Sequence, residues 1–419
     1  MPRDSKFPGM ESFDVIVVGG GPAGMMAAGH AAECGRRVLL IEKNTTLGKK
    51  LNLTGGGRCN ITNAEFDTRA FLSHFGDAAK FLYSPFSRFD VQDTFDFFGG
   101  RGLPLIIEDR KRAFPETEQA TDVTRVLKEY MQENGVGVRL GVSVKRLVLE
   151  EGRVVAVETN QGIFHAESII LATGGVSYRE TGSTGEAFEW LEAVGHTVAE
   201  ATPDIVPLRV KEQWVKDLSG TTLDPMKIVF TAKNGASLSR KGKILFTHFG
   251  LSGPLILNSA HEIKKLLKHG PVEGRLDLFP GLEANEVDRR ILEIFDGNKN
   301  KLVRTVAKML APFGMGKALL AILAPDILEK KVNIVTQEER KILANTLKGL
   351  PLTVTGTGYD WAVVCDGGIP LTEADTRTMS SRIHPNLFII GDLLHVSRPS
   401  GGYSLQLCWT TGWVAAESA

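Results

Sequence analysis

Residues 13–24 read FDVIVVGGGPAG, an apolar β-branched run that passes directly into a Gly-x-Gly-x-x-Gly pattern. Such a run predicts a buried strand. The Ala- and Met-rich stretch that follows predicts a buried helix, closed by Cys34-Gly35. A second apolar run, residues 37–42, ends in an acidic residue. Strand, glycine turn, helix and strand in this order predict a βαβ unit with two parallel strands.

The glycine spacing predicts that this unit binds a dinucleotide. Gly19 permits the tight turn, Gly21 lets backbone approach a pyrophosphate, and Gly24 lets the helix pack closely on the strand. The pyrophosphate would meet the positive end of the helix dipole. Glu42 stands at the tip of the second strand, where a carboxylate accepts hydrogen bonds from ribose hydroxyls. Because this carboxylate would repel a 2′-phosphate, the motif favours FAD or NAD over NADP.

Two segments near the end of the chain favour FAD over NAD. An apolar run ends in Gly391-Asp392, and its carboxylate suits a ribitol hydroxyl, which NAD lacks. Gly401-Gly402 opens the last predicted helix. The N–H groups of that helix suit the pyrimidine edge of a flavin, which becomes negative on reduction. An ordinary strand-end turn would explain Gly391-Asp392 alone, so the argument depends on its combination with the first motif.

The order of these signals predicts an α/β domain made from both ends of the chain. Residues 64–135 read as mainly helical, and a small set of strands with a turn at Glu151-Gly152 follows. Short strands, including a hairpin around Lys233-Asn234-Gly235, precede amphipathic helices rich in Lys and Glu. The expected domains are a FAD domain (1–200 and 356–419) and a β-rich insert (201–355) with a helical subdomain (about 283–348).

Composition narrows the class of protein further. The 419 residues include 49 Lys+Arg and 49 Asp+Glu, so the molecule as a whole does not attract RNA. A local basic patch stays open, but no block of basic residues suggests one, and nucleic acid is not expected as a partner. The four cysteines are dispersed, without C-x-x-C pairs, which indicates a reducing compartment and no metal site. Neither a signal peptide nor an apolar stretch of ~18 residues is present. We therefore expect a cytoplasmic protein that does not enter a membrane.

Four blocks carry a resemblance to a known family. Residues 53–63 read LTGGGRCNITN, similar to the signature loop of bacterial FAD-dependent flavoproteins with a glutathione-reductase-like FAD domain. The match continues at 172–178 with 181–185, at 245–254 (LFTHFGLSGP) and at 399–406 (PSGGYSLQ). Members are described as NAD(P)/FAD-dependent oxidoreductases, some as aminoacetone oxidase-like, and one branch reduces 3-dehydro-bile acids. The resemblance implies a Rossmann FAD domain split by a β-barrel-like insert with a helical subdomain.

The resemblance also implies which residues hold FAD. The family often has Gly-Glu where this chain has Gly391-Asp392, and either carboxylate can serve. The implied contacts, from the adenosine and pyrophosphate side to the flavin side, are Gly19, Gly21, Pro22, Ala23, Gly24, Glu42, Lys43, Val144 through its backbone, Ala172, Thr173, Gly174, Gly56, Gly57, Arg58, Cys59, Asn60, Gly391, Asp392, Gly401, Gly402 and Tyr403.

The sequence does not single out a catalytic group. His248 is a candidate acid/base, since imidazole titrates near neutrality, but it also fits a histidine packed at a domain interface. Tyr403 and Arg398 are candidates for orienting a substrate, and packing or salt bridging explains them equally well. Cys59 invites a redox role, but a disulfide reductase needs a second cysteine in the same loop, and this loop has one.

The expected activity is that of a FAD-dependent oxidoreductase that transfers hydride through flavin N5. The narrower expectation is reduction of an activated C=C bond in a small organic or steroid-like substrate. Because the chain has no second complete Gly-x-Gly-x-x-Gly motif, either NAD(P)H acts as a transient electron donor or the substrate reduces the flavin directly. The alternatives are an oxidase of a small amine that uses O2, an RNA-associated flavoprotein and a non-catalytic flavin-binding protein. The oligomeric state stays open.

Overall fold

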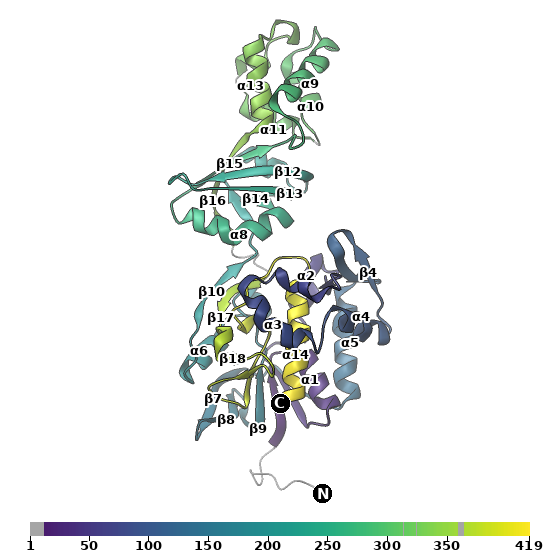
Figure 1. Cartoon of the computed structure of the whole chain (residues 1–419), viewed down its shortest axis with the longest axis vertical. Coiled ribbons are helices and arrows are strands. Elements are labelled where there is room, and N and C mark those ends of the chain that lie inside the picture. Colours follow the sequence, from purple (N-terminus) through teal and green to yellow (C-terminus); the bar gives the residue numbers. More distant parts are fainter. Residues whose placement is uncertain (1–11, 313, 324, 359–363) are drawn as a thin grey trace. The chain divides into compact units, whose positions relative to one another are not determined.

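The chain forms two compact units, each with its own hydrophobic core (Figure 1). The computed structural model describes residues 12–312, 314–323, 325–358 and 364–419. The first unit contains the chain up to Asp204 and from Ala362 onward, and the second unit is Ile205–Trp361. Among the described residues, no helix has the length and apolarity that a membrane span requires.

The first unit is built on the predicted βαβ element. Strand β1 (Ser12–Val18), helix α1 (Pro22–Glu33) and strand β2 (Val38–Glu42) follow one another, and β1 and β2 pair in parallel. Every residue of β2 is buried, as expected for a parallel strand covered on both faces. Strand β9 (Gly162–Leu171) pairs in parallel with the other side of β1.

Both ends of the chain complete this sheet. Strand β6 (Gly137–Leu140) extends it beyond β2, and β20 (Leu387–Ile389) joins β9 in parallel. Helix α14 (Tyr403–Ser418) packs on α1 (Figure 1), where a Cβ on Gly412 would lie 2.6 Å from the carbonyl oxygen of Ala23. Glycine at this position therefore lets the two helices approach closely.

Antiparallel strands surround the parallel core of the first unit. The Glu151-Gly152 turn, with φ of 46° and 77°, joins β7 to β8 as predicted, and β8 pairs with β9. The remaining elements are β7 (Val144–Glu150), β8 (Arg153–Thr159), α6 (Glu186–Ala193), β10 (Ala199–Asp204), β17 (Val364–Gly368), β18 (Ala374–Asp375) and β19 (Ser380–Ser381).

The prediction of a mainly helical segment at residues 64–135 is wrong in one part. Strand β4 (Leu105–Glu108) forms a hairpin with β5 (Arg112–Pro115), which also pairs with β3 (Thr62–Asn63). These strands have four residues or fewer, too few to show an alternating pattern. Arg110 and Lys111 adopt φ of 62° and 57° at the turn, so no glycine marks it. The helices of the segment are α2 (Thr68–Ser73), α3 (Ala79–Phe86), α4 (Val91–Gly100) and α5 (Ala120–Glu133).

The second unit is a closed antiparallel barrel with helices. Its strand order is β11-β14-β13-β12-β15-β16, closed by pairing of β16 with β11. The predicted turn at residues 233–235 joins β12 to β13. The strands are β11 (Leu208–Val210), β12 (Thr222–Thr231), β13 (Ser237–Thr247), β14 (Gly250–Ser252), β15 (Val272–Asp277) and β16 (Leu350–Thr357). The helices are α7 (Gln213–Asp217), α8 (Pro254–Leu267), α9 (Ala284–Asp296), α10 (Val303–Leu310), α11 (Gly316–Ile322), α12 (Pro325–Leu328) and α13 (Gln337–Lys348).

The predicted fold class is confirmed. A Rossmann-like α/β domain is interrupted by a six-stranded antiparallel barrel, and helices α9 to α13 are inserted between the last two strands of that barrel.

Candidate functional site

The glycine turn between β1 and α1 has two tightly packed positions and one open position. A Cβ on Gly19, whose φ is 110°, would lie 2.5 Å from the carbonyl oxygen of Ala172. A Cβ on Gly24 would lie 1.9 Å from the carbonyl oxygen of Gly19, whereas a Cβ on Gly21 would meet nothing within 4 Å. No side chain of the described residues caps α1, which begins at Pro22. The open space at Gly21 therefore adjoins the N–H groups of a helix N-terminus, and this fits a pyrophosphate.

Glu42 is held in place by the same turn. Its Oε2 accepts a hydrogen bond from the backbone N–H of Gly20 at 2.6 Å, and its Oε1 accepts two from Asn44, each at 2.7 Å. The Asn44 amide also donates to the carbonyl oxygen of Thr181. The buried carboxylate is thus oriented by the protein's own N–H groups, as suits an acceptor of hydrogen bonds from ribose hydroxyls. The sequence did not point to Asn44, because its role depends on a segment far along the chain.

The C-terminal glycine-acid pair lies next to the glycine turn. A Cβ on Gly391, whose φ is 64°, would lie 3.3 Å from the Cβ of Ala23 at the start of α1. Asp392 forms an ion pair with Arg398, and Lys50 Nζ lies 3.9 Å from its other carboxylate oxygen. Arg398, a candidate for binding substrate, is 5% exposed and also donates to the carbonyl oxygen of Val396. The structure therefore places Arg398 as a partner that positions Asp392.

Lys50 connects two parts of the site and was not predicted. Its Nζ donates to the Ser177 hydroxyl at 3.2 Å and lies 3.6 Å from where a Cβ of Gly174 would be. Gly174, with φ of 74°, follows β9, and Thr173 beside it is half-buried. Lys50 therefore joins the loop after β9 to the C-terminal carboxylate Asp392. The one sequence signal is its position just before the glycine-rich loop.

Backbone conformation explains the glycines of the signature loop. Gly55, Gly56 and Gly57 have φ of 58°, 70° and 88°, which L side chains rarely adopt. A Cβ on Gly56 or Gly57 would meet nothing within 4 Å, so these two glycines border open space. The loop thus offers bare backbone where a ligand can approach.

Asn60 ties the signature loop to helix α14. In the amide orientation in which its nitrogen and its oxygen both form hydrogen bonds, the nitrogen donates to the carbonyl oxygens of Thr62 at 3.0 Å and Ala113 at 3.2 Å. Its oxygen accepts from the N–H of Gly402 at 3.0 Å. The N–H of Gly402 is therefore engaged within the protein, and the N–H groups of the following residues are those that α14 can present to a ligand. Gly401 has a contact of its own with this segment, since its carbonyl oxygen accepts a hydrogen bond from the Asn63 amide at 3.2 Å.

Arg58 contacts protein groups with one part of its guanidinium and leaves another part for a ligand. Its guanidinium lies 4.2 Å from the centre of the Phe114 ring and pairs with Glu108 and Glu118. Its Nε is buried and has no hydrogen-bond partner among the described residues. This edge of the guanidinium suits an oxygen atom of a ligand.

Cys59 does not have the environment of a redox-active thiol. The residue is fully buried, with φ of 61°. Burial raises the pKa of its thiol to about 12, so the reactive thiolate is strongly disfavoured near neutral pH. The structure thus gives Cys59 a packing environment.

Tyr403 is enclosed by aromatic rings. Its ring centroid lies 4.8 Å from that of Phe71, 4.9 Å from that of His74 and 6.0 Å from that of Phe75. Burial raises the pKa of its hydroxyl to about 12, so the side chain keeps its proton near neutrality. Its position supports packing at the start of α14.

Three other predicted residues occupy separate positions. Lys43 donates to the Thr184 hydroxyl at 2.9 Å and pairs with Glu186, at the start of α6. Val144 is buried at the start of β7. His248 lies in the second unit, exposed at the turn between β13 and β14 and edge-on to Phe249 at 4.9 Å. An acid/base role for His248 stays a prediction.

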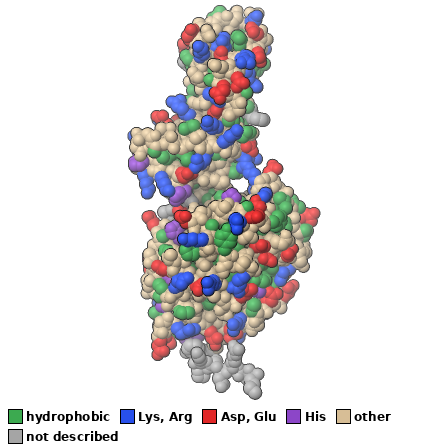
Figure 2. Space-filling model, viewed as in Figure 1, with side chains coloured by type: hydrophobic (Ala, Val, Ile, Leu, Met, Phe, Trp, Pro, Cys, Tyr) green, Lys and Arg blue, Asp and Glu red, His purple; other side chains and the backbone are tan. Residues whose placement is uncertain are grey.

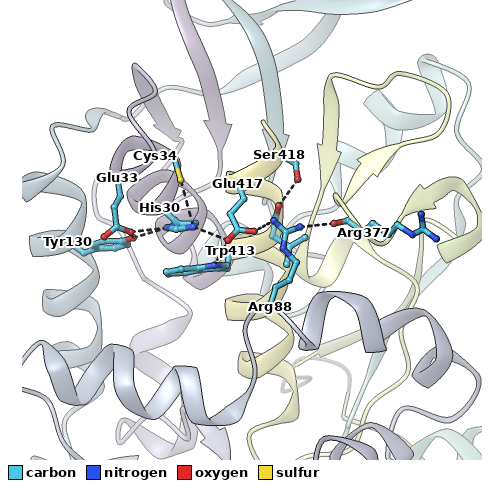
Figure 3. A network of polar contacts seen from close by, with 10 residues as sticks. His30, Glu33, Cys34, Arg88, Tyr130, Arg377, Trp413, Glu417 and Ser418 are labelled. Carbon is cyan, nitrogen blue, oxygen red and sulfur yellow. Dashed lines mark hydrogen bonds and ion pairs between the residues drawn. The ribbon is translucent and has the colours of Figure 1, made fainter.

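A second cluster of titratable groups lies at the other end of α1 (Figure 3). His30 Nδ1 is 2.9 Å from a carboxylate oxygen of Glu33, which also accepts a hydrogen bond from the Tyr130 hydroxyl at 2.5 Å. The His30 ring stacks on Trp413 with centroids 3.4 Å apart. Cys34 Sγ lies 3.9 Å from His30 Nε2, and burial raises the pKa of this thiol as well. The cluster joins α1 to α5 and α14, away from the glycine turn.

Comparison with known proteins gives one family over the whole fold. A protein-family model described as "HI0933-like protein Rossmann domain" matches residues 13–418. The 3-dehydro-bile acid delta(4,6)-reductase of Clostridium scindens is 30% identical, over 96% of this chain and 98% of that protein. The ribosomal RNA dihydrouridine synthase of Escherichia coli is 28% identical, over 97% of this chain and 98% of that protein.

Solved structures share the fold at low identity. A 3-ketosteroid delta1-dehydrogenase from Sterolibacterium denitrificans has a TM-score of 0.53 at 13% identity, with 97% of this chain and 99% of that chain covered. A Mycobacterium smegmatis Sdh1 protein also has a TM-score of 0.53, at 16% identity, with 98% of this chain and 68% of that chain covered. These likenesses concern the arrangement of the elements.

Proposed function

Because the chain belongs to the family described as HI0933-like protein Rossmann domain, and is a FAD-dependent oxidoreductase of that family, we propose that it reduces a C=C bond conjugated to a carbonyl group. One observation carries this proposal. Relatives that match over nearly their full length are named 3-dehydro-bile acid delta(4,6)-reductase and ribosomal RNA dihydrouridine synthase. A 3-keto steroid diene and the C5=C6 bond of uracil differ in shape, but in each the double bond is conjugated to a carbonyl group.

The residues of the first unit supply the binding contacts for FAD. The turn at Gly21 would hold the pyrophosphate and Glu42 the adenosine ribose. Asp392, held by Arg398 and Lys50, would accept hydrogen bonds from the ribitol hydroxyls. When bound, FAD supplies hydride transfer at flavin N5. We propose NAD(P)H as a donor that binds transiently, because the sequence contains one complete dinucleotide-binding glycine motif.

Reduction of a conjugated C=C bond also requires a proton donor for the carbon next to the carbonyl. Of the three candidates, Arg398 is engaged with Asp392 and Tyr403 is enclosed by aromatic rings. His248 is exposed at the turn between β13 and β14, and histidine is the side chain that most often acts as a general acid or base. We therefore favour His248 as the donor.

A uracil base in RNA is a second candidate substrate, supported by the distribution of charge. Residues 205–361 contain 24 Lys and Arg against 16 Asp and Glu, a net charge of +8. The rest of the chain keeps 25 of the 49 basic and 33 of the 49 acidic residues, a net charge of −8. The neutral total therefore does not argue against an RNA partner, and the relative from E. coli is named for ribosomal RNA.

Anaerobic flavin spectroscopy tests the proposed activity. We expect NADH or NADPH to bleach the visible flavin absorbance, and a 3-keto-4-ene steroid or a uridine-containing RNA to restore it without oxygen. His248→Asn should slow only the restoring step, by about 10²-fold or more. Bleaching by a small amine but by neither nicotinamide nucleotide would instead support the oxidase alternative and contradict the proposal.

A further inference from the structure

The positive charge of the second unit is concentrated in one segment. Residues 225–271 contain eight Lys and Arg and a single acid, Glu262. The remainder of the unit has 16 basic and 15 acidic residues, which nearly cancel. We refer to residues 225–271 as the basic segment. Its basic residues are Lys227, Lys233, Arg240, Lys241, Lys243, Lys264, Lys265 and Lys268.

Most of these charges are exposed and uncompensated. Arg240 pairs with Glu262 at 2.5 Å and so uses the one acid of the segment. Within the described part of the chain, six lysines are exposed without an ion-pair partner: Lys227, Lys233, Lys241, Lys243, Lys265 and Lys268. The helical part of the same unit differs, since Arg304, Lys330 and Arg340 there each pair with an acid.

Three of the lysines lie together on the outer face of the β12–β13 hairpin. Lys227 stands directly opposite Lys241 in the antiparallel register, and Lys243 follows on the same face of β13. Like charges in facing positions destabilise a strand pair. On its other side Lys227 faces Asp277, but that carboxylate accepts a hydrogen bond from Lys348 at 2.7 Å. This face therefore carries a repulsion that a bound anion would relieve.

The other three lysines lie where the hairpin turn meets the end of α8. The Lys233 side chain lies over Gly270, where a Cβ would be 3.6 Å from its Cδ and Cε. Lys265 and Lys268 are on the exposed side of the last turns of α8. Figure 2 shows Lys, Arg and His side chains over this part of the second unit. A helix C-terminus favours the lysines of α8, but it does not account for Lys233 on a separate element.

We propose that the basic segment is a docking surface for the phosphate backbone of RNA. This inference rests on the proposed reduction of a uracil base in RNA. Lysines act on phosphates as point charges and supply affinity without reading sequence, as required of a surface that presents RNA to a separate reacting site. An anionic membrane fits less well, because surfaces that bind the bilayer interface also carry exposed large apolar side chains. The exposed large apolar residues of the described chain all lie outside residues 225–271.

Fluorescence anisotropy with a labelled single-stranded oligouridylate tests the proposal on the full-length flavoprotein. The variants are Lys227→Gln/Lys241→Gln/Lys243→Gln for the hairpin face and Lys233→Gln/Lys265→Gln/Lys268→Gln for the α8 end. The control Lys301→Gln/Lys308→Gln/Lys341→Gln removes the same charge from exposed lysines of the helical part. We expect each test variant to bind about tenfold or more weakly, with the slope of log affinity against log salt reduced by about 2, and the control to bind as the wild type does.

The readouts separate this surface from the chemistry. Each variant should keep its flavin and its rate of flavin reduction by NAD(P)H. None should unfold at a lower temperature than the wild type, and loss of the repulsion should raise the unfolding temperature of the hairpin variant slightly. A wild type that does not bind the RNA, or test variants that bind it like the control, would overturn the docking surface. The steroid-like substrate would then stand on its own spectroscopic test. Retention on phosphatidylserine vesicles but not by the RNA would likewise overturn it in favour of a membrane surface.

Discussion

At the residue scale, the glycines of the β1–α1 turn have different roles that sequence spacing alone does not separate. Gly19 and Gly24 are required by neighbouring protein atoms, since a Cβ on either would lie within 2.5 Å of a carbonyl oxygen. Gly21 has φ of −85° and ψ of −174°, a conformation open to any residue, and free space around its missing Cβ. The surrounding fold therefore does not require a glycine at this position, which fits the proposed pyrophosphate site.

This difference predicts opposite outcomes for two substitutions. Gly21→Val should give a folded protein that purifies without flavin, because its side chain would fill the space for the pyrophosphate. Gly24→Ala should impair folding itself, because its Cβ would lie 1.9 Å from the carbonyl oxygen of Gly19. Visible absorbance and circular dichroism of the two purified variants check this. A Gly21→Val protein with a full complement of FAD would contradict the assignment of the pyrophosphate to this turn.

His30 predicts a loss of stability in mild acid. Burial lowers its pKa from the ordinary value of 6.5, although the Glu33 carboxylate acts in the opposite direction and Arg88 and Arg101 add to the lowering. Tyr130, Cys34 and Glu417 also face the ring. Because the unfolded chain takes up this proton more readily than the folded protein, acidification favours unfolding. The contribution of neutral His30 to the free energy of unfolding is complete above about pH 6.5 and is lost as the pH falls toward the lower pKa of the folded state.

The matching experiment compares urea unfolding of the wild type and His30→Gln on either side of that pH. We expect the free energy of unfolding to fall less on acidification in the variant, with a residual fall from His196, whose pKa burial also lowers. His165→Gln is a control, since this histidine is only half-buried on β9. An unchanged pH dependence in His30→Gln would show that His30 does not carry the effect.

At the element scale, elements with regular patterns were predictable and short irregular ones were not. The β1–α1–β2 unit and the β7–β8 turn follow from local apolar runs and from glycines that backbone geometry requires. The β4–β5 hairpin has no such signal, because its turn uses Arg110 and Lys111 in left-handed conformations. The roles of Lys50 and Asn44 could not be predicted for another reason, because contacts with segments far along the chain define them.

Packing of α14 on α1 predicts the effect of one glycine substitution. A Cβ on Gly412 would lie 2.6 Å from the Ala23 carbonyl oxygen and 3.3 Å from the Met26 Cβ. Gly412→Val should therefore separate the helices and destabilise the first unit by about 1–3 kcal/mol. Gly99→Val in α4 is a matched control, because its Cβ would meet nothing within 4 Å and valine suits a helix better than glycine. Equal unfolding temperatures for the two variants would contradict this account of the α1–α14 contact.

At the scale of the whole molecule, a neutral total conceals two units of opposite charge. The balance of 49 basic and 49 acidic residues removes long-range attraction of RNA by the molecule as a whole. It leaves a local basic surface possible, because surface attraction depends on where charges lie within about a Debye length of the partner. Composition could not reveal this, because the partition requires the boundaries of the folded units.

The connection between the units predicts that the second one can be removed. Its two ends leave the first unit through neighbouring strands, since β10 and β17 pair antiparallel with Asp204 opposite Val364. Facing residues of such a pair have Cα atoms about 5 Å apart, a span that a two-residue Asn-Gly turn closes.

Replacing residues 205–363 by Asn-Gly should therefore yield a folded domain that keeps Gly21, Glu42 and Asp392 and still binds FAD. It should lose RNA binding, because the proposed docking surface is absent, and reductase activity, because the proposed proton donor His248 is absent. Absorbance after reconstitution with FAD checks the first expectation, and oligouridylate anisotropy checks the second. A folded but colourless domain would mean that residues of the second unit are needed to hold the flavin, whereas full RNA affinity would locate the docking surface on the first unit.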